Sequence, residues 1–310
     1  MIAFASPEFE PTLAALHASG LPFRPGRFRA GRFANGELFT EFETPVKDED
    51  CLILGSISPP DSQMLSTLLL AHTLRKEGAK QITGVFPYLA YSRQDKQKPR
   101  QSLAAAWTGA MAQASGFDSV MTVDVHSPED EQLFPIPLAS LSPAGIFAAA
   151  LKQHQLTRAT IIAPDKGAIA RCEAIRAAAG LPPAAIPWFE KHRLETGIQH
   201  TRFVGEVGTQ AVLIDDILDT GATLVSACQR LLCAGVEDIQ IMVTHGLFTG
   251  KEWEGLWELG VSRIFCTDTI PSLAAVNDDR IVMLSVTSLL TSALRKIAVQ
   301  RAPAMGSAAS

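Results

Sequence analysis

The thirteen residues VLIDDILDTGATL, numbers 212 to 224, constrain the fold of this chain more than any other segment. Val212, Leu213 and Ile214 form an apolar run that is typical of a central parallel strand. Asp215 and Asp216 follow at its carboxyl end, which is where open α/β sheets bind ligands. Carboxylates there accept hydrogen bonds from sugar hydroxyls, so the segment predicts an α/β domain with a polar ligand site.

The residues that follow predict a phosphate site at the start of a helix. They supply successive backbone N–H groups, two hydroxyl donors and a glycine that permits close approach, and the helix dipole favours the same negative charge. The alternative is an ordinary helix cap, which needs one such side chain rather than several. The predicted phosphate-binding residues are Asp219, Thr220, Gly221, Ala222 and Thr223.

Length and charge exclude several classes of protein. A chain of 310 residues with 47% hydrophobic and 19% charged residues predicts a globular protein of two domains. The net charge of −5 argues against a nucleic-acid partner, which requires clustered positive charge. No uninterrupted apolar run reaches the roughly 18 residues of a membrane span, so we expect no membrane partner.

Cysteine usage indicates a reduced compartment. The five cysteines show no C-x-x-C spacing, and most fall in predicted helices or strands, where a thiol packs as a small hydrophobe. We therefore expect a cytoplasmic protein without zinc.

Strand-like runs alternate with helix-length segments along the chain, which predicts parallel sheets covered by helices. A partial internal repeat, in which a helix, a glycine and a strand follow one another around Gly78 and again around Gly235, indicates two similar α/β domains. We place them at 1–143 and 144–300, followed by a frayed tail at 301–310. The predicted strands cover residues 51–57, 81–88, 119–126, 159–164, 211–214, 238–245, 263–267 and 281–286.

Several other polar segments contain residues that could bind a metal or a phosphate. Asp124 and His126 occupy alternate positions of a predicted strand and would share a side, and His126 could ligate a metal or touch a phosphate. Asp165 suits a ligand of Mg²⁺. Lys191 and Arg193 could act on a phosphate from a mobile flap. Taken singly, each segment could equally be a charged surface loop or a hydrogen-bonded strand end.

Read in order, these segments resemble one family. The motifs GRFANGE, PYLAYSRQDK, DVHSPE, APDKGA, EKHR, DDILDTGAT and CTDTIP, spread over residues 31 to 271, are similar to those of phosphoribosyl-pyrophosphate (PRPP) synthetases, or ribose-phosphate pyrophosphokinases, and are closest in style to the archaeal type. The resemblance implies an α/β fold of two type I phosphoribosyltransferase-like domains, each a mainly parallel sheet flanked by helices.

The resemblance also implies a reaction, a metal and a set of site residues. Mg²⁺-dependent transfer of pyrophosphate from ATP to ribose 5-phosphate would give PRPP and AMP. The ribose-5-phosphate site would be Asp215, Asp216 and 219–223, the metal-associated pair His126 and Asp165, and the catalytic cations Lys191 and Arg193. The ATP contacts would be Phe33, Asn35, Glu37, Arg93, Gln94, Asp95 and His126, of which the first three belong to a neighbouring subunit in the family, so the resemblance implies a homo-oligomer.

The sequence departs from the family pattern at Asn35, where an aspartate is usual. A carboxylate only accepts hydrogen bonds whereas an amide also donates them, so nucleotide preference is in question. Two other functions share some features: a non-catalytic regulatory subunit, and a phosphoribosyltransferase that consumes PRPP. The presence of His126, Asp165, Lys191 and Arg193 argues against both.

Overall fold

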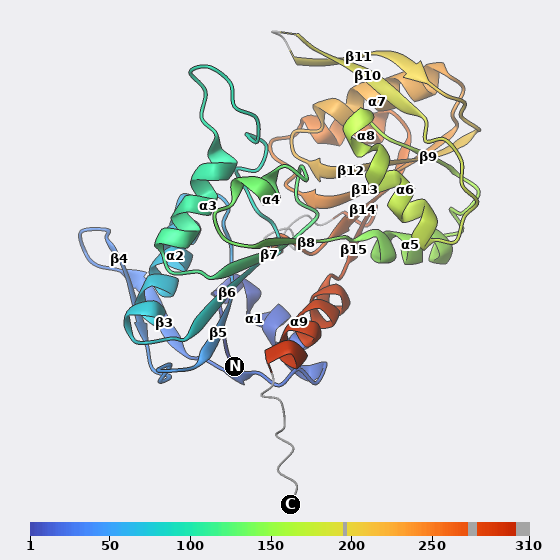
Figure 1. Ribbon diagram of the computed structural model, residues 1–310. Coiled ribbons are helices and arrows are strands. Elements are labelled where there is room, and N and C mark those ends of the chain that lie inside the picture. Colours follow the sequence, from blue (N-terminus) through green and yellow to red (C-terminus); the bar gives the residue numbers. More distant parts are fainter. Residues whose placement is uncertain (195–196, 272–277, 302–310) are drawn as a thin grey trace, which may run out of the picture. The chain divides into compact units, whose positions relative to one another are not determined.

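The computed structural model (Figure 1) describes residues 1–194, 197–271 and 278–301, with side chains given outside 191–201 and 299–301. The chain forms two compact units, one made of residues 1–141 with 287–310 and the other of residues 142–286. Each unit has its own sheet and its own buried core. The expected tail at 302–310 lies outside the described residues.

The first unit contains a six-stranded sheet in the order β2-β1-β5-β6-β7-β8, and every neighbouring pair of strands is parallel. A separate antiparallel hairpin, β3-β4, pairs Arg32 with Leu38 next to its tip. The strands are β1 (Ile2–Ala5), β2 (Arg24–Pro25), β3 (Phe28–Arg32), β4 (Leu38–Phe42), β5 (Asp50–Leu54), β6 (Gln81–Phe86), β7 (Ser119–Val123) and β8 (Leu138–Leu141).

Helices surround this sheet and include the last helix of the chain. The helices are η1 (Pro7–Phe9), α1 (Glu10–Ala18), α2 (Asp61–Lys76), α3 (Ala104–Ala114), α4 (Asp130–Leu133) and α9 (Thr287–Arg301). Helix α9 packs against α1, and Arg295 donates a hydrogen bond of 3.1 Å to the carbonyl of Ser19. The expected second domain, 144–300, therefore differs from the structure in the place of α9, because Leu290 and Leu294 of this helix are buried within the first unit.

The second unit contains a five-stranded parallel sheet in the order β15-β14-β13-β12-β9, and the antiparallel hairpin β10-β11. Its strands are β9 (Thr160–Ile162), β10 (Trp188–Leu194), β11 (Gly197–Val204), β12 (Gln210–Leu218), β13 (Asp238–Gly246), β14 (Val261–Thr267) and β15 (Ile281–Leu284). Its helices are α5 (Ala144–Gln153), η2 (Lys166–Ala168), α6 (Ile169–Ala178), α7 (Ala222–Cys233), η3 (Glu252–Glu254) and α8 (Gly255–Glu258).

The two units repeat one plan. In each, a first strand leads through a short 3-10 helix into an α-helix, an antiparallel hairpin follows, and a central strand then leads through a loop to a helix and the next strand of the sheet. Thus β1, η1, α1, β3-β4, β5, α2 and β6 correspond to β9, η2, α6, β10-β11, β12, α7 and β13. The expected fold of two similar α/β domains is confirmed.

Strand β12 is buried on both faces, which explains its continuous apolar run. Ala211 and Leu213 pack in one cluster with α7, whereas Val212 and Ile214 pack in another with α5 and α6. The buried side chains of α7 recur with helical spacing and so present one apolar face to the sheet; they are Leu224, Ala227, Cys228 and Leu231.

Every strand predicted from the sequence exists and is parallel, but its ends differ. Strand β12 continues to Leu218 rather than ending at residue 214, whereas β5, β6 and β7 end before residues 57, 88 and 126. The sequence predictions missed β1, β2 and β8, and treated β10 and β11 as a flap without periodicity. Short edge strands such as β2, with two residues, carry too little pattern to be identified.

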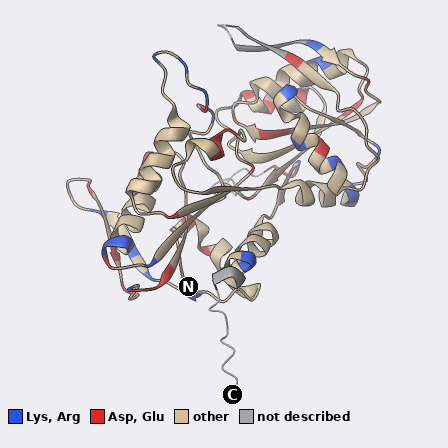
Figure 2. Ribbon diagram, viewed as in Figure 1, with Lys and Arg blue, Asp and Glu red and all other residues tan. Residues whose placement is uncertain are grey.

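The charged side chains and the cysteines are distributed as expected for a protein with buried apolar cores. Lys and Arg alternate with Asp and Glu along the ribbon of both units (Figure 2). All five cysteines are free, and four are buried, so burial raises the pKa of Cys228 and Cys266 to about 12. In the part of the chain that the structure describes, no helix is long and apolar enough to cross a membrane.

The repeated helix end gives a prediction about stability. Gly78 and Gly235 end α2 and α7 with φ of 87° and 85°, and in each case the next residue donates back to a carbonyl of the last turn. An L side chain in this conformation costs about 1–2 kcal/mol. Gly235→Ala should therefore lower the free energy of unfolding by that amount, although a Cβ there has open space.

Gly145→Ala is the matched control, because Gly145 lies inside α5 with ordinary helical φ and open space around it. Alanine is a better helix former than glycine by up to about 1 kcal/mol, so this variant should be neutral or more stable. Denaturant unfolding of both variants checks the pair, and equal effects would contradict the role given to Gly235.

Candidate functional site

The paired carboxylates of the second unit lie inside β12 rather than after it. Strand β13 continues beside β12, pairing Ile217 with His245, so the ladder extends past Asp215 and Asp216. The backbone N–H of Asp216 donates to Oδ1 of Asp215 over 3.0 Å. Asp216 is 7% exposed and Asp215 is half-buried, so both acids are at least partly shielded from solvent near the carboxyl end of the sheet.

Shielding changes the acidity of this pair. Burial raises the pKa of the Asp215 carboxyl well above its usual range, the charge of Asp216 raises it further, and the charge of Arg171 lowers it. The charge of Asp165 also raises it, so Asp165, Asp215 and Arg171 lie close enough to interact. The second unit therefore gathers the acids that the sequence placed in separate motifs.

The loop from Asp219 to Gly221 leads directly into α7, which begins at Ala222. Backbone N–H groups of residues that follow β13 hold it: Leu247 donates to the carbonyl of Leu218 over 2.7 Å, and Thr249 to that of Asp219 over 3.1 Å. Gly221 has φ of 88°, and a Cβ there would lie 2.8 Å from Cα of Trp253. Only glycine fits this position, where the helix start offers its N–H groups to an anion.

Asp165 follows β9 and caps η2, because its Oδ1 accepts from the backbone N–H of Gly167 over 2.9 Å. Arg171 lies six residues later on α6 and is partly buried. Sequence reasoning missed Arg171. The signal was the helix that follows APDKGA, on which Arg171 is the first basic residue.

The closing motif CTDTIP forms a buried hydroxyl network at the end of β14. Thr267 donates to the carbonyl of Thr244 over 2.5 Å, and Thr269 lies 2.9 Å from Nδ1 of His245. Asp268 accepts from the backbone N–H of Val286 over 2.7 Å. These residues hold the carboxyl ends of β13 and β14 together beside β12.

In the first unit, the segments after β6 and β7 converge on Asp130. This side chain is fully buried; its Oδ2 accepts from the backbone N–H of Ser127 over 3.3 Å, and its Oδ1 has no hydrogen-bond partner. Burial, together with the nearby charge of Asp95, raises the pKa of Asp130 to about 7, although the hydrogen bond from Ser127 and the charge of His126 act to lower it. The structure thus brings Asp95 and His126 together, and Asp130 is a further residue that the sequence did not reveal.

The prediction that Asp124 and His126 share one side of a strand is wrong. Strand β7 ends at Val123, and Asp124 has φ of 48°, so strand alternation does not extend through this pair. Arg93 and Gln94 follow Tyr91, which also has positive φ, and both are exposed. Ser102 donates a hydrogen bond to Oε1 of Gln94, which ties this segment to the start of α3.

The tip of the β3-β4 hairpin carries Phe33, Asn35 and Glu37. Phe33 is 58% exposed and stacks at 5.1 Å on Phe39, and Gly36 takes the positive φ of the turn. Oδ1 of Asn35 accepts from the backbone N–H of Glu37 over 3.1 Å. An aspartate would accept the same hydrogen bond, so the turn does not depend on which of the two residues is present. The difference lies in the second terminal atom of the side chain, which is an amide nitrogen in Asn35 and an oxygen in an aspartate.

The remaining site residues can be placed by element only. Lys191 and Arg193 lie on β10, where their backbones pair with His200 and Ile198 of β11. His126 belongs to the first unit and Asp165 to the second, so their pairing stays a prediction. Among the described residues, no group of three or more His, Cys, Asp and Glu side chains is arranged to hold a metal ion.

The central strand of the parallel sheet carries paired aspartates and leads into an Asp-Thr-Gly-Ala-Thr loop. The other unit repeats the same fold. Together these features define a protein with two phosphoribosyltransferase-like domains. Comparison with known families gives the particular group. Residues 2–116 match the N-terminal domain of ribose phosphate pyrophosphokinase, and residues 196–306 match a phosphoribosyl synthetase-associated domain. The chain belongs to the ribose-phosphate pyrophosphokinase family.

Individual relatives cover nearly the whole chain. A ribose-phosphate pyrophosphokinase of Bradyrhizobium diazoefficiens is 30% identical over 296 residues, which are 94% of this chain and 92% of the relative. One of Mycobacterium leprae is 31% identical over 93% of this chain and 89% of its own length. The crystal structure of phosphoribosylpyrophosphate synthetase from Mycobacterium smegmatis matches with a TM-score of 0.85 at 25% identity, covering 96% of this chain and 99% of that one.

The packing of Gly221 gives a prediction. In Gly221→Ala the new side chain has to adopt a positive φ, which costs about 1–2 kcal/mol. It also overpacks against the Trp253 backbone, which costs about 1–3 kcal/mol. The free energy of unfolding should fall by more than it does in Gly235→Ala, which has a similar φ and open space. Denaturant unfolding of the two variants measures the difference, and equal losses would show that Trp253 yields without cost.

Asp130 gives a prediction about pH. Its pKa is raised from 3.8 to about 7 by folding, so the folded state holds a proton that the unfolded chain releases. Its contribution to stability is present below pH 3.8 and is lost as the pH rises through about 7. Asp130→Asn should therefore gain free energy of unfolding relative to the parent protein between pH 4 and 8.

Asp278→Asn is the control with the opposite sign, because hydrogen bonds from Arg280 lower the pKa of Asp278. The ionised Asp278 carboxylate stabilises the parent protein, and this contribution to the free energy of unfolding is lost as the pH falls. Asp278→Asn should therefore be less stable than the parent at neutral pH, and the difference should shrink in acid. Urea unfolding at a series of pH values gives both difference curves. A flat curve for Asp130→Asn would show that this carboxyl titrates as it does in the unfolded chain.

Proposed function

We propose that the protein transfers the β,γ-pyrophosphoryl group of Mg-ATP to the C1 hydroxyl of ribose 5-phosphate, giving PRPP and AMP. The observation that carries the proposal is the β12–α7 loop with its paired acids, in a chain that belongs to this family over nearly its full length. The 5-phosphate would bind the N–H groups and hydroxyls of residues 219–223, and Asp215 and Asp216 would accept hydrogen bonds from the ribose hydroxyls.

ATP would bind mainly to the first unit. Arg93, Gln94 and Asp95 lie on one segment there, and Asp95 interacts electrostatically with the buried Asp130 near His126. Phe33, Asn35 and Glu37 stand at an exposed hairpin tip, which suits an adenine contact made across a subunit boundary. We therefore propose a homo-oligomer in which this tip completes the nucleotide site of a neighbour.

Mg²⁺ is the metal that fits the donors present. A carboxylate such as Asp165 together with substrate phosphates is its preferred environment in proteins. When bound, the ion would neutralise the charge of the phosphates. Asp165 is fixed for this purpose by its own hydrogen bond to the N–H of Gly167.

The chain's own residues would act mainly by positioning and by charge. The C1 oxygen forms a bond to the β-phosphorus, the hydroxyl releases its proton to solvent, and the bond from that phosphorus to the bridging oxygen breaks, so that AMP leaves with that oxygen and its electron pair. Lys191 and Arg193, carried on the β10-β11 hairpin, would stabilise the negative charge that develops on the β- and γ-phosphates. No covalent enzyme intermediate is needed.

A non-catalytic regulatory subunit associated with a PRPP synthetase is the alternative, because the family matched by residues 196–306 is described as a phosphoribosyl synthetase-associated domain. The two are separated by measuring AMP and PRPP formed from ATP, ribose 5-phosphate and Mg²⁺. Equal amounts of both products support the transferase. No product with ATP, GTP or CTP would replace it with the regulatory alternative.

Lys191→Ala should reduce turnover by orders of magnitude and leave the affinity for ribose 5-phosphate nearly unchanged, because the cation acts on charge that appears in the transition state. Steady-state kinetics and calorimetry measure the two quantities. Lys152→Ala, an exposed lysine on α5, is the matched control and should have no effect. Unchanged turnover in Lys191→Ala would remove Lys191 from the mechanism.

A further inference from the structure

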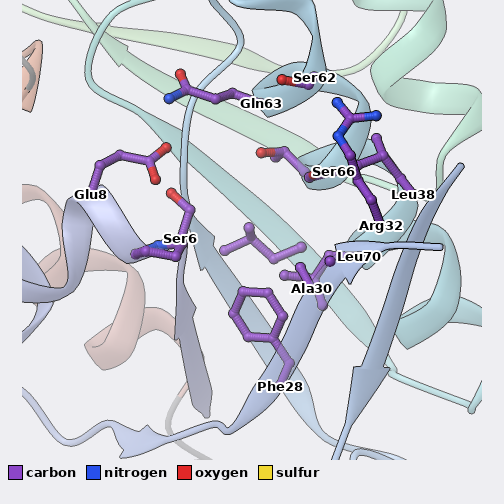
Figure 3. Close-up of a pocket in the computed structure, with 14 residues that line it drawn as sticks. Ser6, Glu8, Phe28, Ala30, Arg32, Leu38, Ser62, Gln63, Ser66 and Leu70 are labelled. Atoms are coloured by element: carbon purple, nitrogen blue, oxygen red, sulfur yellow. The ribbon is translucent and has the colours of Figure 1, made fainter. Parts of the chain in front are cut away.

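A pocket of about 250 Å³ lies in the first unit beneath the β3-β4 hairpin (Figure 3). Its walls come from the loop after β1, the first turns of α2 and the inner side of the hairpin. Figure 3 shows Glu8, Gln63, Ser66 and Arg32 along one side and Phe28 on the opposite side. None of these residues belongs to the site proposed for the reaction.

Several polar side chains of this pocket make no hydrogen bond to the protein. Oγ of Ser6 is buried and has no hydrogen bond, which costs free energy unless a ligand or water supplies one. Within the described part of the chain, the side chains of Glu8, Ser62, Gln63 and Ser66 also make no hydrogen bond to protein. Arg32 is held in place, because its Nη1 donates to the carbonyl of Gly36 over 2.6 Å.

The corresponding hairpin of the second unit is packed differently. There Phe189 is fully buried with the α7 residues of the core, and it stacks on Phe203 at 4.9 Å. In the first unit the hairpin offers Ala30 and Gly31 to α2 instead, and these small residues leave the pocket open. The space is therefore a consequence of how the two halves of the repeat diverged.

The walls favour an uncharged ligand. Helix α2 starts after Pro59 and Pro60, which have no N–H, and its first turn begins with Asp61. Glu8 adds a second negative charge at the pocket. A phosphate dianion would meet the negative charges of Asp61 and Glu8 at a helix start whose cap residue, Pro60, has no N–H to donate.

We propose that this pocket binds a neutral nucleobase or nucleoside. The ring of Phe28 offers a face for stacking, with Leu38, Ile53 and Leu70 completing an apolar floor. Glu8 accepts, Arg32 donates, and Gln63 and the serines do both, which matches the mixed donors and acceptors along the edge of a base. The volume is below the roughly 300–1,000 Å³ of drug-sized sites, which suits a nucleobase or a nucleoside without a phosphate chain.

The test uses the full chain with Mg²⁺ and a saturating non-hydrolysable ATP analogue, so that the proposed catalytic nucleotide site is filled. Adenosine and uridine are titrated by calorimetry and by ligand-observed NMR, with ribose and AMP as comparison ligands. We expect saturable binding of at least one nucleoside, weaker binding of AMP, and none of ribose.

Two variants locate the site. Ser66→Leu fills the pocket and should weaken nucleoside binding at least tenfold, whereas His72→Leu places the same side chain on an exposed part of α2 outside the pocket and should leave binding unchanged. Ala30→Leu, which fills the pocket from the hairpin, replaces Ser66→Leu if circular dichroism shows that the latter is misfolded.

Three outcomes would overturn the proposal: no saturable binding of either nucleoside, equal binding in the pocket-filling variants, or binding of AMP or ribose as tight as that of the nucleosides. The experiment measures nucleoside binding and requires no turnover. Its result can therefore be interpreted even if the protein shows no pyrophosphoryl transfer. Parental AMP formation in Ser66→Leu would further show that the pocket is separate from the catalytic site.

Discussion

The parallel pairing of β12 with β13 is the interaction on which the candidate site depends. It continues past the apolar core to Leu218 and Gly246, and backbone hydrogen bonds to Leu218 and Asp219 extend it into the loops. Both acids and the turn at residues 219–221 are thus fixed to a central strand of the unit, which restricts their conformational freedom before any ligand binds. The Trp253 backbone closes the turn against Gly221.

Repetition of one fold gives a single chain two sheets whose loops and hairpins can diverge separately. Both central strands lead to a helix that ends at a left-handed glycine, but the intervening loops differ: one offers threonines and glycine, the other two prolines. The hairpins differ in the same way, since aromatic side chains fill the space under one and small residues leave it open under the other. Divergence at loops and hairpins, over an unchanged sheet, is how such folds acquire separate sites.

The sequence predicted the sheet and the glycine turn before α7 because both depend on local pattern. An apolar run marks a doubly buried strand, and Asp-Thr-Gly at its end marks a helix start that needs a glycine. The burial of Asp130, the charge of Arg171 near Asp215 and the positive φ at Asp124 depend on neighbours far along the chain, so no local pattern reveals them. The end of β12 was misplaced for the same reason, because β13 determines how far the ladder extends.

The return of α9 to the first unit makes the second unit an insertion within the first. The chain passes between the units twice, at residues 141–142 and 286–287, and the last helix completes the domain that the first residues begin. During synthesis the first unit lacks α9 until the second has been made, so its α1 face stays uncovered for the longest time. A premature stop near the end of the chain would therefore damage the amino-terminal domain first and leave residues 142–286 whole.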